Sequence, residues 1–379
     1  MAKKVKAVKA KAKTAKVKSV KAKAASSKVA KAKPAKAKLA KGKVTKAKTV
    51  KTKATKPMPT KAKTTKSKVS VLKPKKVKKT GAKVTWPKKT REMHNHHMNS
   101  TVWNNFKFRD DDIVIATYAK SGTTWMQQIV SQLVFNGNES TAVAYLSPWV
   151  DLRIIPPEVI AGLEDQTHRR FVKTHLPVDA LVFSPKAKYI FVGRDGRDAA
   201  WSLFNHHINA VDDYFTAFNE TPGRVGPRLE RGSDNVHEFY RAWFAGDGFP
   251  YWPVWENIRS WWSIRNLPNI KFIHFNDMKS DLAGSVRQIA DFLGIEPDTA
   301  TFEKIVAHCT FDYMKAHAEH AAPMGGIMWK GGAQTFVNKG TNGRWRDTLD
   351  EAEVKAYEAK ALKELGPECA NWLTHGGPV

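Results

Sequence analysis

A run of lysine, glycine and hydroxyl residues is the part of the sequence best suited to hold an anion. The residues are Lys120-Ser121-Gly122-Thr123-Thr124. A loop of this composition directs several backbone N–H groups and the positive end of a helix to one place, and its hydroxyl groups add further donors. We therefore predict an anion-binding loop at residues 119–124. An ordinary helix cap, which also favours Ser and Thr, is the alternative for these residues taken alone.

The segments on either side of this loop predict a strand and a helix. Residues 112–118 form a short apolar run, rich in β-branched residues, which is typical of a buried parallel strand. Apolar residues then repeat at helical spacing between Trp125 and Val134, and Gly137 supplies a stop signal. The Walker A pattern has its lysine after the second glycine, whereas here Lys120 precedes the single Gly122. This difference disfavours an ATP-dependent kinase, which remains an alternative.

Residues 118–125, Tyr-Ala-Lys-Ser-Gly-Thr-Thr-Trp, closely resemble the 5′-phosphosulfate-binding loop of the cytosolic-type sulfotransferases. A second segment, residues 170–177, contains the K-T-H-L-P of the same family. The resemblance implies that His175 is the general base for an acceptor hydroxyl and that Lys173 helps to hold the transferring sulfuryl group. A histidine suits this role because its ordinary pKa of about 6.5 leaves it mostly neutral near neutral pH.

Three further segments match the family in the expected order. Residues 188–202 resemble its 3′-phosphate-binding segment, in which an arginine is followed eight positions later by a serine. Residues 309–315 resemble a segment that encloses the adenine, and residues 338–345 resemble R-K-G-x-x-G-x-W. The resemblance implies that Trp125 and Phe311 sandwich the purine. The nucleotide-binding residues that it implies are Lys120, Ser121, Gly122, Thr123, Thr124, Trp125, Arg194, Ser202, Phe275, Thr310, Phe311, Asn338, Lys339 and Gly340.

The chemistry implied by the resemblance is in-line displacement at sulfur. The co-substrate would be 3′-phosphoadenylyl sulfate (PAPS), the acceptor a hydroxyl or an amine of a small molecule, and no metal would be required. The implied catalytic residues are His175, Lys120, Lys173 and Ser202.

Three positions depart from the family pattern. Asn338, Cys309 and Phe275 stand where the family usually has arginine, threonine and tyrosine. These departures leave a second hypothesis open, an inactive sulfotransferase-like scaffold that a basic tail tethers to nucleic acid. The intact Lys120 and His175 favour the enzyme.

The basic charge of the protein belongs to its first 90 residues. The chain of 379 residues has a formal net charge of +29, but residues 1–90 hold 34 lysines and no Asp, Glu or Arg, so residues 91–379 carry a net charge of −5. The repeated K-A-K and K-V-K units predict a disordered tail over residues 1–95, similar to linker-histone tails, ahead of a sulfotransferase domain over residues 96–379. Such a tail binds DNA, RNA or another polyanion by releasing counterions. A solubilising tail without a partner is the alternative.

The order of segments after the tail predicts an α/β fold with three layers. Strand and helix patterns alternate around the anion loop, which indicates a P-loop-like fold with a central, mostly parallel sheet flanked by helices. Only Cys309 and Cys369 are present, which favours a reducing compartment. No apolar run approaches the ~18 residues of a membrane span. We therefore expect a cytoplasmic protein, with nucleoid or nuclear association through the tail left open.

Two groups of residues have no role assigned by the motifs. The aromatic residues between positions 201 and 262 suit either a lid over an apolar acceptor or the protein core. Five histidines lack the regular ligand spacing of a metal site, and we expect them in loops and on helix surfaces: His94, His96, His97, His206 and His207.

Overall fold

Four parallel strands form a sheet in the order β2-β1-β3-β4. In the computed structural model, which describes residues 84–139 and 142–379, they are β1 (Ile113–Thr117), β2 (Phe171–Thr174), β3 (Lys188–Gly193) and β4 (Ile270–His274). Ile115 of β1 pairs with Lys173 of β2 on one side and with Ile190 of β3 on the other. The predicted parallel sheet is therefore confirmed, with the strand before the anion loop at its centre.

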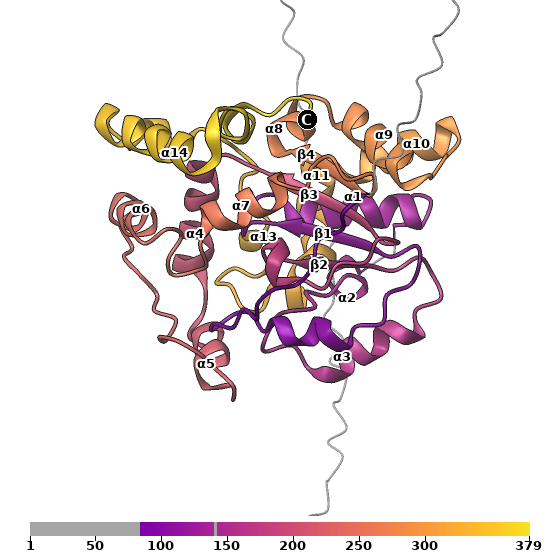
Figure 1. Ribbon diagram of the computed structural model, residues 1–379, viewed down its shortest axis with the longest axis horizontal. Coiled ribbons are helices and arrows are strands. Elements are labelled where there is room, and N and C mark those ends of the chain that lie inside the picture. The colour runs from indigo at the N-terminus through magenta and orange to yellow at the C-terminus, as the bar shows by residue number, and fades with distance from the viewer. Residues whose placement is uncertain (1–83, 140–141) are drawn as a thin grey trace, which may run out of the picture. The chain divides into compact units, whose positions relative to one another are not determined.

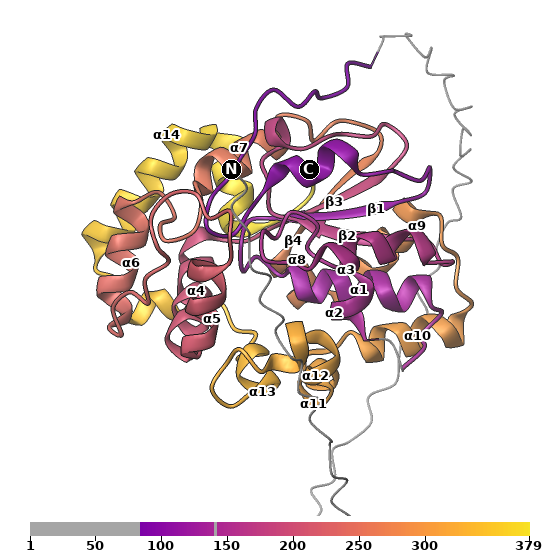
Figure 2. The same ribbon diagram turned by 90° about the horizontal axis from the view of Figure 1, so that it is seen from below.

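Both faces of the sheet are buried because successive strand residues point to opposite sides. Val114 and Tyr189 face one core, which includes residues of α4 (Gly196–Asn209), α6 (Val236–Ala245), α7 (Val254–Trp262) and α14 (Glu351–His375). Ile115 and Ile190 face the other core, with α1 (Thr123–Val134), α9 (Leu282–Leu293) and α10 (Thr299–His308). Figures 1 and 2 both show α4, α6 and α14 on one side of the sheet and α9 and α10 on the other. The three predicted layers are confirmed.

Shorter elements connect these layers. The remaining α-helices are α2 (Val143–Leu146), α3 (Pro157–Ala161), α5 (Asp212–Glu220), α8 (Phe275–Ser280), α11 (Phe311–Ala316), α12 (Ala318–Ala321) and α13 (Ala333–Phe336). The 3₁₀ helices of the described residues are Ser100–Asn105, Gly162–Asp165, Val178–Ala180, Pro323–Gly326 and Arg344–Asp347. No helix in the described ranges is long and apolar enough to cross a membrane.

Local sequence signals explain where two long helices begin. The Asp195 carboxylate accepts a hydrogen bond from the N–H of Arg197 at the start of α4, and α14 begins with a capping box formed by Asp350 and Glu353. Arg197 is also buried, and its guanidinium pairs with Asp195 at 2.7 Å. This ion pair fixes the turn that follows β3.

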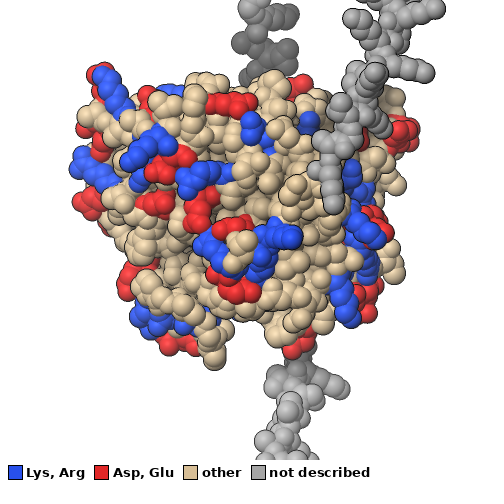
Figure 3. All heavy atoms as spheres, viewed as in Figure 1, with Lys and Arg blue, Asp and Glu red and all other residues tan. Residues whose placement is uncertain are grey.

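Two residues of the segment predicted as tail contact the rest of the described structure. Trp86 stacks on Phe183 with ring centroids 6.1 Å apart, and Arg91 pairs with Asp179 at 2.7 Å. Residues 1–83 lie outside the described residues, so the predicted disorder of the tail stays a prediction. On the face of the domain seen in Figure 3, basic and acidic side chains are interspersed, in agreement with the small net charge of residues 91–379.

Candidate active site

The predicted site residues follow the carboxyl ends of three neighbouring strands. β1 ends at Thr117, three residues before Lys120; β2 ends directly before His175; and β3 ends directly before Arg194. Because the strands are parallel, their carboxyl ends meet at one edge of the sheet, where ligands of such folds bind. The fold therefore brings these three side chains to one place.

A cavity of about 500 Å³ opens at this edge. Fifteen of the sixteen residues predicted for catalysis or nucleotide binding line it: Lys120, Gly122, Thr123, Thr124, Trp125, Lys173, His175, Arg194, Ser202, Phe275, Thr310, Phe311, Asn338, Lys339 and Gly340. The exception is Ser121, whose side chain is buried and whose N–H donates to the carbonyl of Tyr118 at 3.3 Å. The structure thus places Ser121 beneath the loop and outside the lining of the cavity.

The anion loop requires a glycine because its backbone turns sharply against a neighbouring ring. Gly122 has φ +107° at the start of α1, and a Cβ there would lie 2.9 Å from the Phe275 ring. Lys120 also has a positive φ, of 63°. Its carbonyl accepts a hydrogen bond of 2.9 Å from Nη1 of Arg194, which ties the loop to the end of β3. The loop is therefore held in place by Phe275, which follows β4, and by Arg194, which follows β3.

His175 is held in one tautomer. Its Nδ1 lies 2.8 Å from the carbonyl oxygen of Thr117, and because a carbonyl can only accept, Nδ1 must carry the hydrogen. Burial, with smaller contributions from Lys173 and Lys120, lowers the pKa of His175 to about 3. The ring is neutral, so Nε2 keeps a free lone pair. His175 can therefore accept a proton at Nε2.

Cations dominate one half of the cavity. Burial and the neighbouring Arg194 and Lys173 lower the pKa of Lys120 to about 7; burial lowers that of Lys173 to about 8 and that of Arg194 to about 10. No carboxylate is among the described residues that line the cavity. These cations are poorly solvated and have no acidic counterpart there, so a ligand with several negative charges fits this half.

Two cations in the cavity lining, Arg344 and Lys279, were not predicted from the sequence. Neither was Asn342, which contacts a lining residue: its Oδ1 accepts a 2.6 Å hydrogen bond from Nη2 of Arg194. Nε of Arg344 is buried and has no hydrogen-bond partner among the described residues. Asn342 and Arg344 belong to the segment 338–345 that the motif had marked, so their polar side chains were a usable signal.

Aromatic and aliphatic side chains form the other half of the cavity. Trp149 lies edge-on to His175 with ring centroids 4.6 Å apart, and Trp252 lies 5.4 Å from His175. Of the aromatic residues between positions 201 and 262, Tyr214, Phe218, Tyr251 and Trp252 line the cavity, whereas Trp243 and Trp255 are buried in the core. The stretch therefore contributes to the wall of the cavity and to the core, and the lid stays a prediction.

We expected the unassigned histidines in loops and on helix surfaces. His96 and His97 do lie in a loop but are buried, whereas the expectation is wrong for His207, which is a buried residue of α4. His97 also lines the cavity. His206 also lines it, with Nδ1 3.3 Å from Nζ of Lys120. Aromatic neighbours cover these rings; for example, the ring centroids of His97 and Phe218 are 4.0 Å apart. A pattern of polar residues on a helix cannot show that a distant segment covers them.

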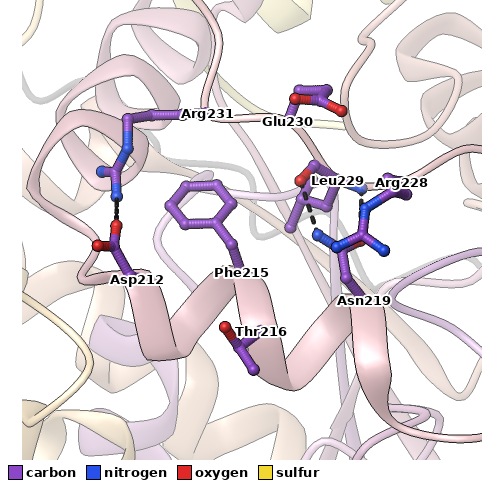
Figure 4. Close-up of a pocket in the computed structure, with 8 residues that line it drawn as sticks. All are labelled: Asp212, Phe215, Thr216, Asn219, Arg228, Leu229, Glu230 and Arg231. Atoms are coloured by element: carbon purple, nitrogen blue, oxygen red, sulfur yellow. Dashed lines mark hydrogen bonds and ion pairs between the residues drawn. The ribbon is translucent and has the colours of Figure 1, made fainter.

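A second, smaller pocket of about 270 Å³ lies between α5 and residues 228–231 (Figure 4). Both of its arginines are already paired: Arg231 binds Asp212 at 2.7 Å, and Arg228 binds Glu220 at 2.7 Å. Asn219 bonds both the N–H and the carbonyl of Leu229. This pocket therefore has no concentration of free charge comparable with the cavity at the sheet edge.

The comparisons with known proteins decide the family. Residues 110–366 match the family model described as a sulfotransferase domain. The chain belongs to the sulfotransferase family. It is therefore an enzyme that transfers a sulfuryl group from PAPS. Within the described ranges, no group of three or more His, Cys, Asp or Glu residues could hold a metal ion.

Individual sulfotransferases resemble the chain over most of their length. A glycolipid sulfotransferase of Mycobacterium bovis is 33% identical over 300 residues, which cover 72% of this chain and 91% of that protein. Human sulfotransferase 2B1 is 31% identical, with 68% of this chain and 67% of that protein covered. A mouse sulfotransferase, SULT7A1, complexed with PAP has the same fold, with a TM-score of 0.55, 22% identity and coverage of 72% and 91%. A retinol dehydratase in complex with androsterone and PAP gives a TM-score of 0.54, 25% identity and coverage of 70% and 83%.

Proposed function

We propose that the enzyme sulfates a hydroxyl group of an apolar acceptor, with His175 as the general base. The observation that carries this proposal is the position of His175 between the two halves of the cavity. Its pKa is lowered by burial and further by Lys173 and Lys120 on the cationic side, and its ring contacts Trp149 and Trp252 on the aromatic side. A hydroxyl held at Nε2 would therefore lie between an anionic donor and an apolar acceptor body.

The reaction that follows from this arrangement is a single displacement. The acceptor oxygen forms a bond to sulfur and its proton passes to Nε2 of His175, while the bond from sulfur to the 5′-phosphate oxygen breaks. The leaving nucleotide, adenosine 3′,5′-bisphosphate (PAP), keeps the electron pair and the added negative charge. Lys120 would stabilise that charge, because a cation placed in advance where charge develops lowers the barrier.

The donor would occupy the cationic half of the cavity. We assign the phosphosulfate end to Lys120, Gly122, Thr123 and Thr124, with Lys173 near the sulfuryl group. We assign the 3′-phosphate to Arg194, Ser202, Asn338, Lys339 and Gly340, and the purine to Trp125, Phe275, Thr310 and Phe311. This division is supported by the cations without a carboxylate among the described lining residues, and by the buried Nε of Arg344 that has no partner there.

The acceptor would be an amphiphile or another mainly apolar alcohol. Its half of the cavity is lined by Leu152, Ile154, Ala217, Phe218, Pro323, Met324, Met328, Trp329, Phe336 and Val337, together with the aromatic residues around His175. The relative from Mycobacterium bovis is named a glycolipid sulfotransferase. An apolar tail in this half and a hydroxyl at His175 fit that class of acceptor.

Calorimetry with PAP and an activity assay test the proposal together. We expect saturable one-site binding of PAP to the full chain and sulfate transfer from PAPS to apolar alcohols in the presence of EDTA. Because a segment with many lysines would attract any polyanion, the titration is repeated at high salt, where site binding should persist. Absence of one-site binding in a folded protein would favour the scaffold hypothesis. ATP-dependent transfer that needs Mg²⁺ would favour the kinase.

We further propose that residues 1–90 bind a polyanion such as DNA or RNA independently of catalysis. The support is the charge of this segment, 34 lysines without an acidic residue. A chain lacking residues 1–83 is expected to lose its affinity for DNA at low salt and to keep its turnover. Filter binding over a range of salt concentrations and the sulfation assay would measure the two effects. Loss of turnover in a truncated protein with unchanged thermal unfolding would contradict separate functions.

A further inference from the structure

Four polar side chains form a chain of contacts along the aromatic half of the cavity. Nδ1 of His96 contacts Nδ1 of His97, and Nε2 of His97 lies 3.2 Å from Oη of Tyr214. The Tyr214 hydroxyl lies 3.3 Å from Oη of Tyr251. His97, Tyr214 and Tyr251 line the cavity, and His96 is buried. These four side chains thus bring polar atoms into a cavity wall that is otherwise mainly apolar.

The direction of these hydrogen bonds is set at the buried end. The His96 ring bonds the backbone of Pro250, and since proline has no N–H, His96 must donate to its carbonyl. Burial lowers the pKa of His96 to about 4 and that of His97 far below its ordinary value, so each ring is neutral and has one N–H. His96 therefore accepts at Nδ1 from His97. Nε2 of His97 then accepts from the hydroxyl of Tyr214.

The two tyrosines continue the same order of hydrogen-bond donors and acceptors toward the cavity. Burial raises the pKa of Tyr214 and of Tyr251, so both phenols keep their hydrogen. The hydrogen of Tyr214 is engaged with His97, and the contact between the two phenols therefore requires Tyr251 to donate to Tyr214. A hydroxyl has one donor and two acceptor sites. With both hydrogens engaged inside the chain, the two phenol oxygens offer only lone pairs to a ligand.

This acceptor-only position borders the same indole ring as the general base. The Trp252 ring centroid is 5.4 Å from His175 and 5.3 Å from Tyr251. Trp149 is 4.6 Å from His175 and 6.1 Å from His97. His175 and Tyr251 therefore both border the ring of Trp252, and an apolar scaffold that packs on this ring can reach both of them.

We propose that Tyr214 and Tyr251 form a second recognition point, which binds a hydrogen-bond donor of the acceptor other than the reacting hydroxyl. The preferred acceptor is then an apolar scaffold with a second hydroxyl besides the one that reacts. A carbonyl oxygen at the same place could not hydrogen-bond to the phenol oxygens, because all of these atoms would be acceptors. They would then be buried without a hydrogen-bond partner. The inference rests on the proposed function, because it takes His175 as the place where the reacting hydroxyl binds.

Three acceptors that differ in one oxygen test this inference on the full chain: androstanediol, androsterone and androstanol, which have a second hydroxyl, a ketone and no second oxygen. The readout is kcat/KM for sulfation of the hydroxyl that the three share. We expect the diol to exceed the ketone by about tenfold, the size of a typical net hydrogen bond to a ligand. Equal values for the three compounds would overturn the inference.

Phenylalanine variants separate recognition from a structural effect. Tyr251→Phe should raise the KM for the diol more than the KM for androstanol. Tyr214→Phe should release the Tyr251 hydrogen for donation, so its kcat/KM for the ketone should rise relative to that for the diol. Tyr240→Phe is the control, because Tyr240 is a buried tyrosine outside the cavity lining whose hydroxyl has no partner among the described residues. Equal losses for all three acceptors in the cavity variants would overturn the inference. If the wild-type protein did not bind PAP, the proposed function would be overturned instead.

Discussion

Replacement of His175 by alanine is expected to reduce turnover by about 10²–10⁴-fold, the usual contribution of a general base. The acceptor hydroxyl would keep its proton in the transition state, and no other described group has been placed at that position. PAP affinity should be unchanged, because the assigned nucleotide contacts come from other residues. Steady-state assays with saturating PAPS, paired with PAP calorimetry, would measure both quantities.

His308→Ala is the matched control for this variant. His308 has the same 7% exposed fraction as His175 but lies outside the lining of the cavity, where its Nδ1 contacts Gln132 at 2.9 Å. We expect it to affect thermal unfolding more than turnover. If His175→Ala retained wild-type turnover, His175 would have no role as a base.

The pH dependence should distinguish His175 from an ordinary histidine. Burial and the neighbouring lysines lower its pKa to about 3, so the free enzyme keeps the neutral base down to that pH. kcat/KM should therefore show no loss near pH 6.5 that is due to this group. An acid limb at pH 6.5 in a protein that stays folded would contradict the assignment.

Stability must be followed in parallel, because several histidines destabilise the folded protein in acid. The pKa values of His96, His97 and His207 are also lowered by burial. The unfolded chain then binds more protons below its ordinary histidine pKa of about 6.5, so the free energy of unfolding falls as the pH falls through that value. Thermal unfolding at each pH would separate this effect from a change in the mechanism.

The sequence could predict that the residues proposed to bind the donor lie together, because their positions are encoded locally. Lys120, His175 and Arg194 each follow a strand within three residues, and parallel strands bring such positions to one edge. Short motifs were therefore enough to predict which of these residues meet at the edge of the sheet. Ser121 shows the limit of this reasoning, since a loop motif does not say which hydroxyl turns toward the ligand and which is buried beneath it.

The acceptor half could not be predicted because it is assembled from distant segments. His97, Trp149 and Trp329 come from separate parts of the chain and meet only through tertiary packing. None of them belongs to a repeated or spaced pattern. The buried histidines illustrate the same point: His207 lies in the polar last turn of α4, yet Phe215, Phe239 and Tyr251 cover its ring. Burial depends on these covering residues, which local periodicity does not reveal.

Lys120→Met is expected to lower turnover by about 100–1000-fold, the usual cost of removing a preorganised charge from the transition state. The variant keeps an unbranched side chain of similar length, so the loop and its contact with Arg194 through the Lys120 carbonyl should persist. PAP affinity should also fall, because one cation of the donor half is lost. Lys186→Met serves as the control, since Lys186 is exposed and pairs with Asp110 outside the cavity lining. Wild-type turnover in Lys120→Met would exclude Lys120 from catalysis.

The charge of Lys120 gives this prediction a second, independent readout. Burial and the neighbouring Arg194 and Lys173 lower its pKa to about 7, so in the free enzyme the ammonium form is lost as the pH rises through that value. An anionic donor prefers the ammonium form, and kcat/KM for PAPS should therefore fall above pH 7. Lys120→Arg keeps its charge throughout this range and should remove the fall, even if its maximal rate is lower. If the arginine variant kept the same alkaline limb, a group other than Lys120 would control it.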